Sequence, residues 1–195
     1  MKTATMELDE SFEIPMHPDT VWALLCDPRR AVACIPGAEL GEEHPDGSFE
    51  GSLTASLGPT VVTFTGTVLP EFDHAGKTGS LVGSGEDRRG RSKAQVTTTF
   101  SVRTGASAGT TALQLSSRCS VIGGVASFVS TGGPHLARRM LAEFADNVAE
   151  RSAKPVGEAV ELKRLNFVAM LRLVLGALGD ALRRATPRRK SRSTS

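Results

Sequence analysis

The sequence predicts an α+β fold in which a coiled antiparallel sheet of about six to seven strands wraps round a long C-terminal helix. Between residues 39 and 121, apolar residues alternate with polar ones, which is the period of half-buried strands. Residues 134–150 instead repeat their apolar side chains at three- and four-residue steps, as an amphipathic helix does. A sheet and a helix that each bury one face pack together, so we expect a core or a pocket between them.

Before the sheet proper, the chain is expected to form one strand and two small helices. The strand covers residues 8–14 and is ended by a proline. A first helix is expected at residues 17–27, followed by a short helix and turn at residues 29–37. The turn contains the apolar pair Ile35 and Pro36. A loop of this kind borders a pocket or, more commonly, packs over the core.

The alternating segments form a meander of about six strands, if the N-terminal strand is left out. They lie at residues 38–43, 49–57, 62–68, 79–85, 94–102 and 111–121. Their inward positions carry many small residues, namely Gly51, Ala55, Gly66, Gly79, Gly83, Gly85, Ala94 and Ser117. Each glycine alone is equally well explained by a bulge or a bend. Together they favour a cavity, because a packed interior needs large side chains between the small ones.

Several motifs occur in the order and at the intervals of one known family. They are DPRRAVACIPGAEL at 27–40, GSFEG at 47–51, LGPTVVTFTG at 57–66, GSGEDRRGRSKA at 83–94, GTTAL at 109–113 and VIGGVASF at 121–128. Over residues 6–150 the chain resembles the carbon monoxide dehydrogenase CoxG family, which is part of the START-like (SRPBCC) helix-grip superfamily. The resemblance implies a six-stranded coiled sheet and a long C-terminal helix that closes a deep apolar cavity.

The resemblance also implies an accessory role. The family helps a molybdenum-containing carbon monoxide dehydrogenase or a related hydroxylase to work at the membrane, with quinone binding in the cavity as the means. We therefore expect a non-covalently bound lipophilic molecule, such as the respiratory quinone menaquinone, and no covalent cofactor. The residues expected to contact it are Ile35, Pro36, Phe64, Val68, Leu81, Val96, Phe100, Phe128, Leu136, Met140 and Phe144.

One departure from the family pattern is the sequence Gly132-Gly133-Pro134. Two glycines and a proline weaken the hydrogen-bond ladder of a helix. We therefore expect the C-terminal helix to be interrupted here, either by a plain kink or by a hinge at the entrance of the cavity.

Charge divides the chain into two parts. Residues 1–152 carry 13 Lys+Arg against 18 Asp+Glu, and residues 153–195 carry 10 against 3. We expect a ligand-binding domain at 1–152, a linker at 153–160, and an amphipathic helix with a basic tail at 161–195. Charged residues interrupt the apolar run of this helix, so it should lie on an anionic membrane surface and not cross it. The residues expected to contact the membrane are Phe167, Leu171, Val174, Leu175, Leu178, Leu182, Arg183, Arg184, Arg188, Arg189 and Lys190.

The tail helix has a second interpretation, in which it docks on its own domain or on a partner protein. Nucleic-acid binding is not expected, because the basic tail lacks interleaved aromatic residues and the domain is acidic. Three cysteines without C-x-x-C spacing and the absence of a signal-peptide pattern favour a cytoplasmic protein that is peripheral at the inner face of the cell membrane.

Catalysis has little support in the sequence. The four histidines fall on expected turns and helix starts, and none has a metal-ligand spacing. Asp87 is expected to form a turn. We therefore expect no catalytic and no metal-binding residues, and an accessory protein instead of an enzyme. The alternative is a START-like cyclase or hydrolase acting on an apolar small molecule, which would require a polar catalytic cluster inside the cavity.

Overall fold

The computed structural model describes residues 2–57, 60–87 and 91–153. The expected linker beyond residue 153 and the tail helix, with all its membrane-contacting residues, lie outside the described residues. Contacts group Met1–Ala153 into one compact unit. None of the helices in the described ranges is long and apolar enough to cross a membrane.

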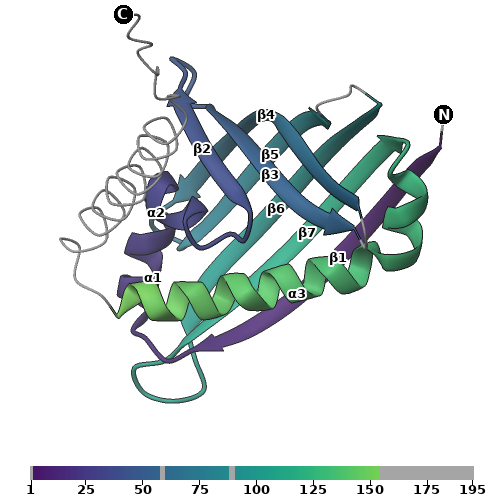
Figure 1. The fold of residues 1–195 in the computed structure, drawn as a ribbon. Helices are drawn as coiled ribbons and strands as arrows, with labels where there is room; N and C mark the ends of the chain where they lie inside the picture. Colours follow the sequence, from purple (N-terminus) through teal and green to yellow (C-terminus); the bar gives the residue numbers. More distant parts are fainter. Residues whose placement is uncertain (1, 58–59, 88–90, 154–195) are drawn as a thin grey trace, which may run out of the picture. The chain divides into compact units, whose positions relative to one another are not determined.

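The sheet has seven antiparallel strands in the order β1-β7-β6-β5-β4-β3-β2 (Figure 1). From β2 onward each strand pairs with the next one along the chain, and β1 closes the series by pairing with β7. The N-terminal strand and the meander of six strands are therefore confirmed. The strands are β1 (Thr3–Ile14), β2 (Ala38–Glu43), β3 (Phe49–Leu57), β4 (Thr60–Asp73), β5 (Thr78–Asp87), β6 (Ser92–Thr104) and β7 (Thr111–Gly123).

Two short helices, α1 (Pro18–Leu25) and α2 (Pro28–Val32), connect β1 to β2. Each begins with a proline at its first position, where the missing N–H costs nothing. The residue before each proline caps the helix. The His17 ring accepts a hydrogen bond from the backbone of the first turn of α1, and Asp27 accepts two such bonds in α2. These local signals explain why two separate helices form where the sequence predicts them.

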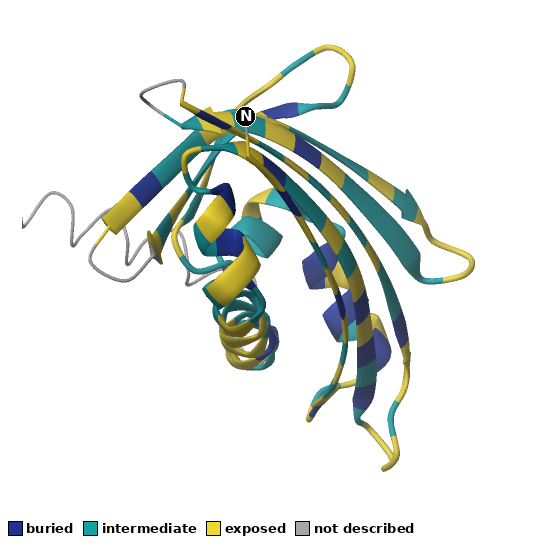
Figure 2. Cartoon of the chain, turned by 90° about the vertical axis from the view of Figure 1, so that its right-hand side faces the viewer, coloured by how far each residue is buried: buried dark blue, intermediate teal, exposed yellow. Residues whose placement is uncertain are grey.

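The C-terminal helix α3 (Ala126–Ser152) is continuous in its hydrogen-bonded assignment and contains Pro134. The expected interruption is therefore wrong as a break, although the helix bends sharply between its first turns and its long remainder (Figures 1 and 2). The proline removes one N–H from the ladder and crowds the preceding turn, which bends the axis. Gly133 is buried beside Val129 and Met6, so packing against β1 on both sides of the bend offsets the lost hydrogen bond.

The buried apolar residues form two separate clusters on the face of the sheet that α3 covers. The first cluster joins α1, the loop after α2 and the second half of α3 to the sheet through Ile14, Val21, Trp22, Leu24, Leu25, Cys34, Val102, Leu113, Leu115 and Val148. The second cluster lies under the start of α3 and consists of Ala4, Val121, Ala126 and Val129. The helix therefore rests on packed side chains at both of its ends.

Candidate ligand-binding site

The register of the strands shows which side chains share the face that α3 covers. Because side chains alternate along a strand, Ala4 and Val121 of the second cluster define this inner face for β1 and β7. The pairings carry the same face across the sheet to β6, β5, β4 and β3. The expected ligand-contacting residues of the strands, Phe64, Val68, Leu81, Val96 and Phe100, all fall on it.

The inner face is packed at both ends and less tightly covered between them. Leu113 of the first cluster is fully buried, whereas Val68, Leu81 and Val96 are only partly buried. These three residues belong to neighbouring rows, because Val68 and Val96 both flank Gly83 while Leu81 lies two residues away along the same strand. The helix packs chiefly on β1, with further contacts to α1 and β7. Water therefore reaches apolar side chains that face the interior of the fold.

The second half of α3 contributes apolar side chains at four-residue steps. Leu136, Met140 and Phe144 lie in one line along the helix. Phe144 packs against the first cluster, so the line points toward the interior. Leu136 and Met140 are partly exposed, and so is Phe128 in the first half of the helix. We call the following set the open inner face: Phe64, Val68, Leu81, Val96, Phe128, Leu136 and Met140.

Two expected ligand contacts belong to the packed end instead. Phe100 and Phe144 both pack against the first cluster. The Phe100 ring lies 6.1 Å from the Trp22 ring and 6.4 Å from the Phe72 ring, measured between centroids. A Cβ atom on Gly79 would come within 2.4 Å of the Phe100 ring, so this glycine makes room for the aromatic side chain. Large aromatic side chains complete the core under α1, a role that their alternating position alone does not distinguish from pocket lining.

The loop that holds Ile35 and Pro36 connects the sheet to α3. The Asn147 side chain on α3 donates a hydrogen bond of 2.9 Å to the carbonyl of Cys34. On the other side, the carbonyl of Gly37 accepts a hydrogen bond of 2.9 Å from the backbone N–H of Thr54 on β3. Ile35 and Pro36 are partly exposed between these two attachments. The loop therefore bridges β3 and the helix, as expected for the rim of a pocket.

The inward glycines do not leave empty space at every site, which corrects one sequence-based argument for a cavity. Gly51, Gly66, Gly85 and Ala94 lie opposite one another on four successive strands. A Cβ atom on Gly66 would lie 1.9 Å from the carbonyl oxygen of Ser84, and one on Gly85 would lie 3.0 Å from that of Thr65. These glycines permit the close backbone approach that a strongly coiled sheet needs. The evidence for an accessible interior is the partial exposure of the open inner face.

Polar groups near the site have mainly structural partners. Asp87 accepts a hydrogen bond of 3.1 Å from the backbone N–H of Arg91, which fits its expected role in a turn. His74 lies near the Trp22 indole, which donates a hydrogen bond of 3.3 Å to its ring. The hydrogen bond from Lys77 lowers the pKa of Asp19 and ties the β4–β5 turn to α1. Across residues 2–57, 60–87 and 91–153, no group of three or more His, Cys, Asp or Glu side chains could hold a metal ion.

The three thiols are protonated in buried or partly buried surroundings. Burial raises the pKa of the Cys34 thiol to about 11, an effect that Arg151 and Arg30 only partly oppose. Burial also raises the pKa of Cys26 and of Cys119. A thiolate is the reactive form of cysteine, so these residues are inert at neutral pH.

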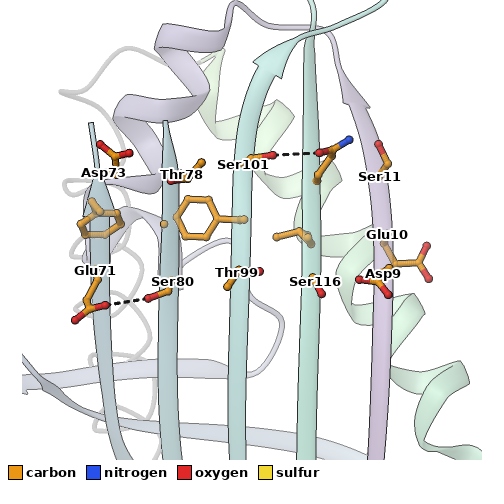
Figure 3. A pocket seen from close by; sticks show the side chains of 15 residues that line it. Asp9, Glu10, Ser11, Glu71, Asp73, Thr78, Ser80, Thr99, Ser101 and Ser116 are labelled. Carbon is orange, nitrogen blue, oxygen red and sulfur yellow. Dashed lines mark hydrogen bonds between the residues drawn. The ribbon is translucent and has the colours of Figure 1, made fainter. Parts of the chain in front are cut away.

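A second hollow lies on the outer face of the sheet, and its volume is about 870 Å³ (Figure 3). Its polar side chains come mostly from alternate, outward positions of β1, β4, β5, β6 and β7, and the helices lie behind the sheet in this view. Ser80 donates a hydrogen bond to Glu71, and Ser101 donates one to Gln114. Sequence reasoning missed this hollow, although the Ser and Thr residues at outward positions are its signal. Hydroxyl and carboxylate groups offer no apolar burial, so the lipophilic ligand belongs to the inner face.

Comparison with known proteins gives a family and a fold. The family model for carbon monoxide dehydrogenase CoxG matches residues 11–153. A conserved protein from Geobacillus kaustophilus has a similar structure, with a TM-score of 0.66 and 18% identity, covering 76% of this chain and 95% of the other. No curated protein matches the chain.

Two structures of named proteins are also similar. The ZhuI aromatase/cyclase from Streptomyces sp. R1128 has a TM-score of 0.56 and 14% identity, covering 80% of this chain and 98% of its own. Norcoclaurine synthase from Thalictrum flavum has a TM-score of 0.52 and 18% identity, covering 78% and 89% respectively. At these identities the likeness concerns the fold, which is the START-like helix grip.

Proposed function

Since the chain belongs to the carbon monoxide dehydrogenase CoxG family, we propose that it is an accessory protein that holds a lipophilic ligand between α3 and the inner face of the sheet. The observation that carries this proposal is the open inner face. Val68, Leu81 and Val96 are apolar and face the interior, yet they remain partly exposed between two packed clusters. Removing such surface from water contributes about 25 cal/mol for each square ångström, which favours an apolar occupant.

The proposed ligand is an isoprenoid quinone such as menaquinone, bound without a covalent link. The proposed partner is a molybdenum-containing carbon monoxide dehydrogenase or a related redox enzyme, as the family name implies. The protein would bring the quinone to this enzyme at the inner face of the cell membrane. The basic tail would hold it to anionic lipid, since each Lys or Arg near such a surface adds about 1 kcal/mol of attraction.

Ligand retention tests the first part of the proposal. Protein purified without detergent is examined by native mass spectrometry, and the bound material is extracted and identified. We expect a quinone or another isoprenoid lipid at near one molecule per chain. Reloading the stripped protein with menaquinone should quench the fluorescence of the single tryptophan, Trp22. Failure to retain or reload any apolar molecule would contradict the proposal.

Coupling to the enzyme requires a separate test. The purified dehydrogenase, membrane vesicles and the full-length protein are combined, and reduction of membrane quinone by the enzyme's substrate is followed. We expect the rate to depend on the accessory protein and to fall when residues 158–195 are deleted. A rate that is the same with and without the protein would contradict the coupling role, although it would leave ligand binding intact.

A further inference from the structure

Two hydroxyl groups lie together on the inner face of the sheet. Thr98 on β6 and Ser117 on β7 are directly opposite each other, and their side-chain oxygens are 2.8 Å apart. Both residues occupy inward positions and both are partly buried. Their row continues to Leu81 on one side and to Leu8 on the other, so the hydroxyl pair has apolar neighbours in both directions.

The other inward hydroxyl groups of these two strands have structural roles. Ser92 at the start of β6 accepts a hydrogen bond from the backbone N–H of Val125, where the chain enters α3. Thr111 at the start of β7 donates a hydrogen bond to the carbonyl of Met16. Thr98 and Ser117, in contrast, bond only to each other among the described residues. Neither of them fixes a turn, a cap or a loop.

Their position is also distinctive, because it falls between the two packed clusters. The row on one side contains Phe100 and Leu115, which pack in or against the first cluster. The row on the other side contains Val96 and Cys119, and Cys119 packs against the second cluster. The hydroxyl pair therefore lies in the middle of the sheet, beside the open inner face.

Hydrogen-bond accounting shows what the pair can still offer. Each hydroxyl carries one O–H donor and two acceptor lone pairs. One O–H is used within the pair, which leaves one O–H donor in a partly buried, apolar surrounding. A polar group in such a place is costly when it has no partner, and it binds an acceptor more strongly than it would in water.

We propose that Thr98 and Ser117 form a polar anchor that donates a hydrogen bond to an oxygen of the lipophilic ligand, so that the site selects ligands with a carbonyl-bearing head group. This inference rests on the proposed function and makes it more specific. The apolar tail is bound by burial, whereas the anchor sets how deeply the head group enters. A pure hydrocarbon of the same shape would leave the spare O–H without a partner.

The test compares two double variants. Thr98→Val with Ser117→Ala removes both hydroxyls, and because both partners become apolar, no unpaired group remains and the fold is preserved. The matched control is Thr99→Val with Ser116→Ala. This pair lies in the adjacent row of the same two strands, also directly opposed, but faces outward. Melting temperatures of all three proteins are measured first.

Affinity is then measured for two probes, a short-tailed menaquinone and an analogue with the same tail on a naphthalene ring that carries no oxygen. Quenching of Trp22 fluorescence reports the quinone, and displacement of the quinone reports the analogue. We expect the inner double variant to bind menaquinone about tenfold more weakly, the effect of one lost hydrogen bond to the head group. Its affinity for the analogue should be unchanged, and the outer control should match the wild type with both probes.

Other outcomes separate this inference from the proposed function. If the inner variant binds menaquinone as tightly as the wild type does, or loses both probes equally, the anchor is wrong although the protein still binds lipophilic ligands. If the wild type binds both probes equally well, head-group selection is likewise wrong. If the wild type binds neither probe, the proposed function itself fails and the anchor fails with it.

Discussion

Asn147 on α3 donates its side-chain amide to the backbone carbonyl of Cys34 at 2.9 Å, and this hydrogen bond fixes the second half of the helix to the loop that carries Ile35 and Pro36. The acceptor residue, Cys34, is fully buried. The bond therefore connects the helix to the expected rim of the ligand site through the interior of the fold. Nothing in the amphipathic pattern of α3 marks Asn147, since a polar residue on a helix is normally solvated.

Replacing Asn147 with Asp keeps the shape of the side chain and removes its N–H donors. We expect a loss of about 1–3 kcal/mol in the free energy of unfolding, because the Cys34 carbonyl is left without its partner. Urea denaturation measures this value. Asn147→Gln, which retains the amide on a longer side chain, should recover part of the loss. Equal stability of the Asp variant and the wild type would show that the hydrogen bond contributes nothing.

Gly66→Ala should destabilise the sheet because the new methyl group would meet the Ser84 carbonyl oxygen at 1.9 Å. Overpacking of this kind costs about 1–3 kcal/mol or more. Gly132→Ala is the matched control. Its methyl group would meet the Phe128 ring at an ordinary 3.5 Å, and alanine is favoured over glycine within a helix by about 1 kcal/mol. Chemical denaturation should therefore move in opposite directions for the two variants.

Leu81→Trp tests whether the space beside the open inner face accepts added volume. A partly exposed side chain can be enlarged without displacing packed neighbours, so we expect little change in melting temperature together with loss of quinone retention. Val82→Trp is the control, since Val82 follows on the same strand but faces outward and is 51% exposed. It should retain quinone. A large fall in the melting temperature of Leu81→Trp alone would show that Leu81 belongs to a packed core.

Cys34 predicts a specific dependence of stability on pH. Its folded pKa of about 11 lies above the value of 9.0 for a free thiol, so folding favours the protonated form. The associated stability is present below pH 9 and is lost as pH rises toward 11. Comparing urea denaturation at about pH 8 and about pH 10 should show a smaller fall for Cys34→Ala than for the wild type. The chain contains no tyrosine, which removes one competing titration in this range.

An accessory protein should show no turnover of its own. We expect incubation with quinols, thioesters and aromatic polyketides to give no product above background. Turnover that is abolished by changing one inward carboxylate or histidine would support the alternative of a START-like cyclase or hydrolase. Loss of activity in heat-denatured protein alone would not distinguish the two, so the single-residue variant is the informative control.

Periodicity and turn residues were sufficient to predict the strands, because exposure alternates along them and prolines and glycines mark their ends. They were insufficient at Pro134, where packing of Gly133 against Met6 keeps the helix continuous. They also could not separate Phe100 from Val96. Both are inward residues of one strand, and only the position of Trp22 makes Phe100 part of the core. Asn147 was missed because its partner is a backbone carbonyl more than one hundred residues away.

The bend in α3 has a consequence for the order in which the domain opens. The long segment after Pro134 is fastened by large side chains, whereas the first turns rest on a small cluster built from two alanines and two valines. The start of the helix also lacks a side-chain cap. Local unfolding begins where least apolar surface is buried, so amide hydrogens of the first turns should exchange before those of the remainder. The proline would then separate a fraying segment from a stable one, and a guest molecule could enter at the frayed end while the rest of the domain stays folded.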